Sequence, residues 1–433
     1  MPAKNGFIKI IFTIAIVSFP VWTNASDYNV LDFGAKGDAQ TDNTAAFQAA
    51  INEAGEKGGT VFVPAGQFRF NGVLTLAPGV TVKGIAEGPP AASLERGTMF
   101  LAFAGRDDED SPPFIVMQNN STLKGLSIYY PEQTITDVHP YPWTIQIRGN
   151  RCNLIDLTLV NSYHGIDCGS IYHGQDYLRN ILMWALRTGI YIDRVVDIGR
   201  LENVQIHPSG WFELGANPDA IRDYAMNHLE GFIIGRCDWE YMVNCFVIWA
   251  KVGFRFIETK GDPVGNDPQA NVLITQSGSD VGPLAVVVES TQSHAGIAFE
   301  NCQFMDGILI EETNRGPVKL TNCGFWGWAE SLGGTHIVNK GTGTVYLTAC
   351  NFVAENWIEC HWMEHIPYIL MLNGTLHIMN CRFQDKGNTP DAHIFLGENV
   401  RSAAIVGNSV EGGGLKITNK SNGDVQILGN LTE

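Results

Sequence analysis

The sequence is poor in positive charge: 28 lysines and arginines stand against 45 aspartates and glutamates, which gives a formal net charge of −17. A chain with this balance lacks the basic surface that attracts nucleic acid or an anionic membrane, so neither is an expected partner. It also mildly disfavours a strongly polyanionic substrate. Beyond its first 25 residues the sequence lacks any apolar run of ~18 residues, the length that spans a bilayer. We therefore expect a soluble mature protein.

The first 25 residues have the pattern of a secretory signal peptide. Two lysines precede an apolar run that ends at Trp22, and Thr23-Asn24-Ala25 offers a cleavage site. We expect residues 1–25 to be removed and the mature protein to be secreted or periplasmic. An uncleaved N-terminal anchor is the alternative.

A six-residue pattern, FENCQF at Phe299–Phe304, recurs along most of the chain. Later copies are LTNCGF, LTACNF and IMNCRF, and earlier, more aliphatic copies are LRNILM, LENVQI and MVNCFV. Aligning the copies gives a mostly amide column: Asp156, Asn180, Asn203, Asn244, Asn271, Asn301, Asn322 and Asn380. The next column is apolar: Leu157, Ile181, Val204, Cys245, Val272, Cys302, Cys323, Cys350 and Cys381.

The spacing and alternation of these copies predict the fold. Most copies stand about 20 to 30 residues apart, which is typical of solenoids, and each alternates inward and outward with the period of a strand. Asparagine recurring at a bend suits an amide ladder that satisfies backbone groups between stacked coils. The sequence therefore predicts an all-β fold, a single-stranded parallel β-helix in one elongated domain over residues 26–433.

The nine cysteines are an odd number, and at least five occupy the inward column. Cysteine that exchanges with leucine and valine behaves as a small buried apolar side chain. A disulfide framework is therefore not expected, although a pair among Cys152, Cys168 and Cys237 stays open.

The segment before the repeats predicts an N-terminal cap, about residues 28–59, ahead of coils over about 60–433. A strand and a glycine turn lead to a helix that Thr41 or Asp42 caps. Its apolar face is expected to cover the open end of the first coil. That face consists of Ala46, Phe47, Ala50, Ile51 and Ala54.

The runs LDFGAKGD, TDNTAAFQAAI and GGTVFVPAGQF, between about Tyr28 and Phe70, resemble the N-terminal signature of the pectate lyase superfamily domain, which is related to the family 28 glycoside hydrolases. The resemblance implies a right-handed parallel β-helix with an N-terminal capping helix, and an exported enzyme that processes polysaccharides. It does not fix the reaction, because the superfamily includes hydrolases, lyases, epimerases and phage adhesins.

Several motifs of that superfamily are missing. The repeats contain no Asn-Thr-Asp, paired Asp-Asp, Gly-His-Gly or Arg-Ile-Lys set of polygalacturonases, and no Trp-Ile-Asp-His pattern of pectate lyases. The acidic run Asp107–Asp110 is either a calcium loop or a solvated loop, and we favour the latter. His361 and His365 are four residues apart but lack the HExxH order of zinc sites, so no metal is expected there.

Two long insertions are predicted to leave the same edge of the solenoid, at residues 207–230 and 353–368. Both are rich in tryptophan, histidine and carboxylates, and a substrate channel is expected beside such excursions. Trp211, Trp239 and Trp249 either stack on sugar rings or fill the core.

Four carboxylates near the ends of glycine-led strands are the catalytic candidates. Asp193 and Glu258 are expected two coils apart, roughly 9–10 Å at ~4.8 Å per coil, near the wide end of the range for inverting hydrolysis. Asp238 and Glu240, in the adjoining turn, complete or replace that pair. The expected substrate-binding residues are Arg194, Trp211, Arg236, Trp239, Tyr241, Trp249 and Lys251. The alternative is a surface salt-bridge ladder that joins Arg236 to Glu258.

Three classes of function follow from these residues. The favoured one is a glycoside hydrolase that uses paired carboxylates. The second is a polysaccharide lyase, in which Lys251, Arg236 or Arg255 removes a proton beside a uronate carboxylate that arginine or calcium neutralises. The third is a carbohydrate-binding or adhesin β-helix without catalysis. No cofactor is expected unless the lyase uses calcium, the expected partner is a polysaccharide or oligosaccharide, and the oligomeric state is not predicted.

Overall fold

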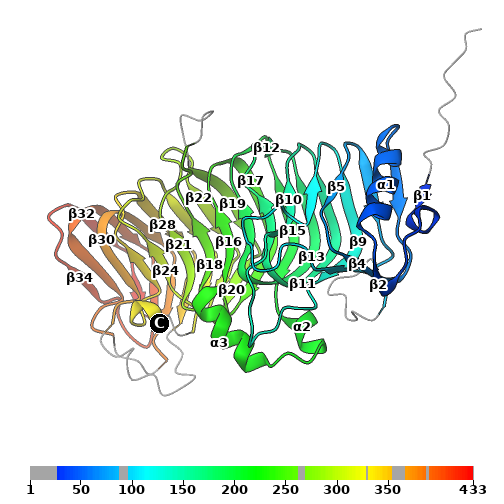
Figure 1. The fold of residues 1–433 in the computed structure, drawn as a ribbon. Helices are drawn as coiled ribbons and strands as arrows, with labels where there is room; N and C mark the ends of the chain where they lie inside the picture. The colour runs from blue at the N-terminus through cyan, green and yellow to red at the C-terminus, as the bar shows by residue number, and fades with distance from the viewer. Residues whose placement is uncertain are drawn as a thin grey trace, which may run out of the picture.

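The computed structural model describes residues 27–86, 96–261, 269–327, 330–353, 366–386 and 390–432. Within these residues, 36 strands pair in parallel into one continuous winding sheet. The chain advances along a single long axis from the helix at its N-terminal end to the last strands (Figure 1). The predicted parallel β-helix is confirmed, whereas the proposed signal peptide lies outside the described residues.

Three ladders of strands make the faces of the solenoid. Sheet 1 contains β1 (Asp27–Asn29), β3 (Gly59–Phe62), β6 (Val80–Lys83), β19 (Ala270–Thr275), β22 (Ile297–Glu300), β25 (Val318–Thr321), β28 (Thr344–Thr348) and β35 (Asp424–Leu428). Sheet 2 contains β2 (Asp38–Asp42), β4 (Gly66–Phe70), β7 (Thr98–Ala102), β20 (Gly278–Asp280), β23 (Gln303–Phe304), β26 (Gly324–Phe325), β29 (Asn351–Val353), β31 (Arg382–Gln384), β33 (Ser409–Glu411) and β36 (Leu431–Thr432). Sheet 3 contains β5 (Leu74–Leu76), β8 (Ile115–Met117), β10 (Trp143–Ile147), β16 (Glu230–Ile234), β18 (Val252–Phe256), β21 (Leu284–Val288), β24 (Ile308–Ile310), β27 (Ile337–Asn339) and β34 (Ile417–Asn419).

Longer strands bend from one sheet into the next. Sheets 1 and 2 share β9 (Thr122–Tyr129), β15 (Arg200–Ile206) and β17 (Cys237–Ile248), and β30 (Ile369–Met379) and β32 (Ile394–Val406) run from sheet 3 into sheet 1. All three sheets share β11 (Asn153–Cys168) and β13 (Tyr177–Ile192). The short strands β12 (His173–Gly174) and β14 (Val195–Val196) lie between sheets 3 and 1. We call the bends from sheet 1 to 2, 2 to 3 and 3 to 1 turns A, B and C.

Turn A holds the predicted amide ladder. The Asn180 amide donates to Asp156 (2.8 Å), Asn203 to Asn180 (2.8 Å) and Asn244 to Asn203 (3.0 Å). The ladder residues have positive φ, which asparagine tolerates better than most side chains. One assignment was wrong: Thr275 pairs with Val243, so Gln276 rather than Asn271 follows Asn244 in the column.

Replacing Asn203 by alanine should lower the free energy of unfolding by about 2–4 kcal/mol. The variant loses both ladder hydrogen bonds. Alanine also lacks the side-chain contacts that offset the cost of φ 55° for asparagine at this position. Urea denaturation measures the loss. Asn203→Gly separates the two causes, because glycine removes the hydrogen bonds but adopts positive φ without strain. Equal stability of the wild type and the alanine variant would contradict the ladder's role.

The N-terminal cap is α1 (Thr44–Gly55), preceded by the 3-10 helix η1 (Val30–Phe33). Phe47, Ala50, Ile51 and Ala54 are buried, as predicted, and Phe47 packs edge-on against aromatic rings of the first coils. The helix begins slightly later than predicted: Asn43 is the N-cap residue, while the Asp42 carboxylate accepts from the Thr44 amide (3.0 Å). The predicted amphipathic plug is therefore present.

Turn B carries long insertions in some coils and none in others. Residues 103–114 and 130–142 precede β8 and β10, whereas α2 (Ser209–Glu213) and α3 (Pro218–His228) precede β16. Between these insertions, β11 and β13 pass through turn B without an excursion. The α2–α3 insertion lies along one edge of the solenoid (Figure 1), where α2 packs on β11 and α3 on β13. Residues 354–365 of the second predicted insertion lie outside the described residues.

Eight cysteines belong to the described part of the chain, and all eight are buried and unpaired, including Cys152, Cys168 and Cys237. The open pairing among those three is thus not formed. The remaining short element is the 3-10 helix η2 (Glu330–Leu332). No helix in the described ranges is long and apolar enough to cross a membrane.

Candidate functional site

Asp193 follows β13 at turn C, and its carboxylate turns into the protein. It accepts from the backbone amides of Arg194 (2.7 Å) and Arg236 (2.9 Å), from the Thr259 hydroxyl, and from the Tyr191 hydroxyl (2.5 Å). The side chain is 1% exposed. A carboxylate saturated by donors from three successive coils ties those coils together and has little capacity left for a substrate.

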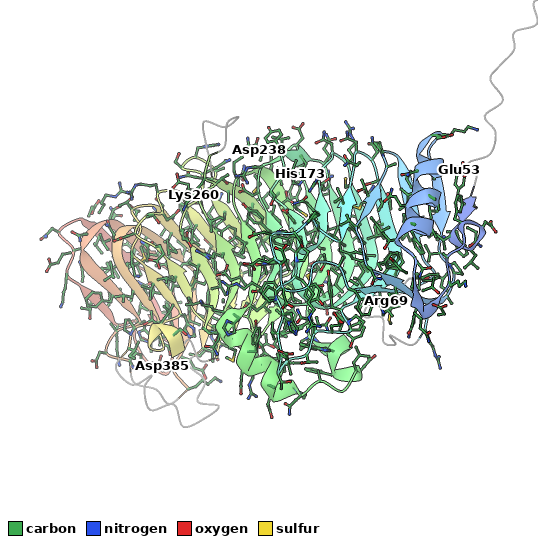
Figure 2. The ribbon with its side chains drawn as sticks, viewed as in Figure 1. Glu53, Arg69, His173, Asp238, Lys260 and Asp385 are labelled. Carbon is green, nitrogen blue, oxygen red and sulfur yellow. The ribbon has the colours of Figure 1, made fainter. Side chains whose placement is uncertain are left out.

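Some of the other charged residues of turn C form ion pairs or hydrogen bonds within that turn. Arg236 is buried and pairs with Asp238 of its own turn (2.9 Å) rather than forming the predicted ladder with Glu258. Arg194 donates to the Gly169 and Lys260 carbonyl oxygens. Glu258 is exposed. Figure 2 shows Asp238 at the edge of the solenoid opposite α2 and α3, so these candidates do not face the long insertion.

Glu240 lies inside turn C, in a buried cluster with His173 and Asp176. His173 Nε2 lies 2.8 Å from an Asp176 carboxylate oxygen, and Oε2 of Glu240 is buried without a hydrogen-bond partner among the described residues. Burial, followed by the negative charge of Asp176, raises the pKa of Glu240 to about 8. We call these three residues the turn C cluster; their burial points to an effect on stability.

The aromatic candidates divide between core and surface. Trp211 of α2 is 4% exposed and fills the core, whereas Trp239 is 54% exposed at turn C. Trp249 is partly buried against Phe212 of the insertion (6.1 Å between ring centres). Tyr241 points outward from sheet 1, and Lys251 is exposed at turn B. Only some of these side chains therefore share an edge, and the described structure does not gather them into one site.

A different group gathers where β11 and β13 cross turn B. His164 of β11 pairs with Thr188 of β13 in register, which places Tyr163 beside Arg187 in the next coil. Trp143 of β10 and Tyr163 pack on the His164 ring, each at 4.8 Å between ring centres. We call Glu109, Trp143, Tyr163, His164, Arg187 and Tyr224 the His164 cluster.

Both neighbouring insertions reach this cluster. From the N-terminal side, Glu109 Oε2 lies 3.4 Å from His164 Nε2. From the C-terminal side, α3 contributes Tyr224, whose ring lies tilted against that of His228 (4.4 Å between ring centres), and the His228 carbonyl oxygen accepts from Arg187 (3.5 Å). Five separate chain segments thus meet at the stretch of turn B without an excursion: insertion 103–114, β10, β11, β13 and α3.

The cluster has the electrostatics of an acid–base site. Burial lowers the pKa of His164, Glu109 opposes that shift and Arg187 adds to it, so the imidazole is neutral near pH 7. Burial raises the pKa of Tyr163, and its phenol stays protonated. Arg187 is exposed and has no carboxylate within ion-pair distance among the described residues. The group offers a proton acceptor, a proton donor and a cation that pairs with no carboxylate among the described residues.

The acidic run Asp107–Asp110 is part of the wall beside this cluster. Asp107 binds His139 Nδ1 (2.7 Å) and Arg106 (3.5 Å), and Arg106 also reaches Glu132 (3.3 Å). These pairs link insertion 103–114 to insertion 130–142. Within the described ranges no group of three or more histidine, cysteine or acidic side chains is arranged to hold a metal ion, and His361 and His365 lie outside those ranges.

Sequence reasoning missed His164 because a single histidine has no metal-ligand spacing. A signal was present: Tyr163-His164 and Arg187-Thr188 immediately precede the leading glycines Gly165 and Gly189 of two successive coils. Those two coils also lack the insertions that flank them. Residues in register on two adjacent coils without insertions therefore locate this cluster better than a search for segments rich in aromatic residues.

Known proteins resemble this chain most clearly at its N-terminus. Residues 28–102 match the family model described as rhamnogalacturonase A/epimerase, pectate lyase-like, which confirms the predicted resemblance. Alginate lyase 7 of Azotobacter vinelandii is 57% identical over 47 residues, 11% of this chain and 6% of that protein. Mannuronan C5-epimerase AlgE5 of the same organism is 44% identical over 79 residues, 16% of this chain and 8% of that protein. The chain thus spans under a tenth of the length of these relatives.

Solved structures match over nearly the whole chain. DFA-IIIase from Arthrobacter chlorophenolicus A6 is 9% identical with a TM-score of 0.53, over 91% of this chain and 98% of that one. The N-terminal fragment of bacteriophage phi29 gene product 12 is 14% identical with the same TM-score, over 93% and 70%. At these identities the likeness shows the parallel β-helix fold alone.

Proposed function

We propose that this protein is an exported polysaccharide-modifying enzyme that removes the C5 proton of a uronate residue, as a lyase or a C5-epimerase. The observation that carries the proposal is the neutral His164 imidazole beside the Tyr163 phenol and the exposed Arg187 guanidinium. The names of the N-terminal relatives, an alginate lyase and mannuronan epimerases, support the same substrate class.

Each residue has a role in this reaction. Arg187 binds the uronate carboxylate and stabilises the negative charge that develops when the C5–H bond breaks. His164 takes that proton, since a base must be neutral to accept it. Tyr163 then donates a proton, either to the departing glycosidic oxygen, which leaves a C4–C5 double bond, or back to C5 from the opposite face. Trp143, which is partly buried beside His164, supplies an aromatic surface for the sugar.

A glycoside hydrolase is the second candidate. It is favoured by the exposed Trp239 next to Asp238 at turn C, with Glu258 also accessible there. Against it, Asp238 is already paired with Arg236 and Asp193 is saturated by protein donors. The predicted carboxylate set therefore ranks below the His164 cluster.

Incubating the mature protein with uronate and neutral polysaccharides in D2O should distinguish these reactions. We expect unsaturated uronate ends, detected by ultraviolet absorbance, or deuterium at C5 without chain cleavage, detected by NMR. Arg187→Gln should lower turnover of uronate polymers at least about 10-fold, since a charged hydrogen bond contributes about 1.5–3 kcal/mol. Arg179→Gln, on the sheet 1 part of the same strand, is the matched control.

New reducing ends with neither unsaturation nor deuterium would overturn this proposal in favour of the hydrolase. In that case Asp238→Asn and Glu258→Gln should abolish the reducing ends, while Arg187→Gln should leave them unchanged.

A further inference from the structure

The outer face of sheet 2 carries a cavity of about 480 Å³, away from the His164 cluster and on later coils. It opens where Gly278 follows Phe246 in the outward column and Gly324 follows Gln303. Two outward positions without side chains leave a hollow at this point of the face. A Cβ at Gly324 would stand 2.2 Å from the Gln303 amide oxygen, so the Gln303 side chain depends on that glycine for its place over the sheet.

The turn A ladder is interrupted at the same point. Asn244 donates to Asn203, and Asn322 donates to Asn301, but Gln276 occupies the position between the two runs. The side chains of Gln205 and Gln276, which line the cavity, form no hydrogen bond to another described residue. Their amides are thus available to a ligand.

The lining combines flat apolar surface with neutral polar groups. Phe246, Met305 and Trp326 supply the apolar part, and the Trp326 indole is oriented by a hydrogen bond to Gln303 (3.3 Å). Asp280 supplies the one carboxylate of the lining, and its Oδ1 is buried without a hydrogen-bond partner among the described residues. The lining residues include no lysine or arginine.

We infer that this cavity is a second carbohydrate site, which binds a short neutral saccharide. Its volume lies in the ~300–1,000 Å³ range of small-molecule sites. Aromatic and methionine side chains cover the C–H faces of a sugar, and amide and carboxylate groups pair with its hydroxyls. A uronate would meet Asp280, and Asp306 behind it, without a cation to neutralise it. The site therefore selects against the charged sugar that Arg187 attracts.

The cavity's binding does not depend on the reaction proposed for the His164 cluster. A bound neutral glycan would hold the enzyme on a mixed polymer, or on a neighbouring glycan, while the His164 cluster acts on uronate residues. The two sites are therefore separable by experiment, because one needs a cation and the other lacks one.

Isothermal titration of the mature protein with neutral gluco-, manno- and galacto-oligosaccharides, and with mannuronate and galacturonate oligosaccharides, tests this inference. We expect at least one neutral series to bind and Trp326→Ala to weaken that binding at least 10-fold, without changing turnover of a polymer that consists of uronate residues alone. Gln205→Ala, which removes an amide from the outer face of β15 without touching the core, should weaken it as well. Tyr346→Ala, an exposed aromatic on sheet 1, should not.

Absence of neutral binding at millimolar concentration would overturn the inference. So would neutral binding of unchanged strength in both Trp326→Ala and Gln205→Ala. If Trp326→Ala melts at a lower temperature than the wild type, Gln205→Ala alone decides between the two outcomes.

Discussion

Replacing His164 by glutamine should reduce kcat/KM on the responsive polysaccharide by about 10²–10⁴-fold, the usual contribution of a positioned acid–base group. Glutamine fills much of the space between Trp143 and Tyr163 and keeps a polar group toward Glu109, but it cannot accept and return a proton. The melting temperature should therefore change little. Single-turnover assays on the purified variant measure the loss of the chemical step separately from substrate binding.

The pH dependence of the same reaction gives an independent check. His164 must be neutral to act as base, and burial lowers its pKa below the ordinary 6.5. Activity of the wild type should rise with pH through an ascending limb below pH 6.5 and then level off. That limb should be absent from the residual activity of His164→Gln.

His377 provides the matched control. It lies on sheet 1, stacked on Tyr346, so His377→Gln removes an imidazole of similar exposure without touching turn B. Its kcat/KM should equal that of the wild type. Full activity of His164→Gln, with an unaltered pH profile, would remove His164 from the mechanism and with it the proposed proton abstraction.

The fold was predictable because each coil repeats the same physical requirements. A residue such as Asn203 must tolerate positive φ and pair with its equivalents in two neighbouring coils, and a residue such as Cys245 must fit a narrow interior. These demands leave a column of similar residues in the sequence. The prediction was wrong at Asn271 because this coil has a glutamine, Gln276, at the ladder position. An alignment that looks for asparagine therefore shifts the register of the coil and selects Asn271 instead.

The site was less predictable because the inward and outward alternation of side chains ceases where strands end. Asp193 and Glu258 belong to neighbouring columns just beyond sheet 3, yet Asp193 turns inward to backbone amides of later coils while Glu258 faces solvent. Gly235 permits that inward turn, since a Cβ there would stand 2.6 Å from the Asp193 carboxyl carbon. Such a contact joins residues 42 or more positions apart, and no local pattern records it.

The turn C cluster should make the protein lose stability as pH rises from about 4.5 to about 8, and Glu240→Gln should remove most of that loss. Glu240 keeps its proton in the folded protein up to a pKa of about 8, whereas the unfolded chain releases it near the ordinary glutamate pKa of 4.5. The folded state therefore binds more protons across this interval, so the free energy of unfolding falls as pH rises. At ~1.4 kcal/mol per pH unit, the loss reaches about 3 kcal/mol by pH 7.

The neighbours of Glu240 act in the same direction. The pKa of His173 is raised, because its pairing with Asp176 outweighs the opposing effect of burial, and burial raises the pKa of Asp176. The stability that protonated His173 and Asp176 contribute is thus also lost as pH rises. The free energy of unfolding of Glu240→Gln should therefore still fall with pH, but less steeply than that of the wild type. Gly199 is part of this arrangement, since a Cβ there would stand 2.4 Å from Glu240 Oε2.

Urea denaturation of the wild type and Glu240→Gln at pH 5, 6, 7 and 8 measures this effect. The two proteins should be closest in stability at pH 5, and the variant should be the more stable one at pH 8, because glutamine fills the same space without a charge to bury. Glu258→Gln is the matched control: its carboxylate is exposed at the same turn, so its curve should follow that of the wild type. Parallel curves for the wild type and Glu240→Gln would mean that Glu240 ionises in the fold as easily as in the unfolded chain, and a loss of turnover without a change in slope would return it to the catalytic candidates.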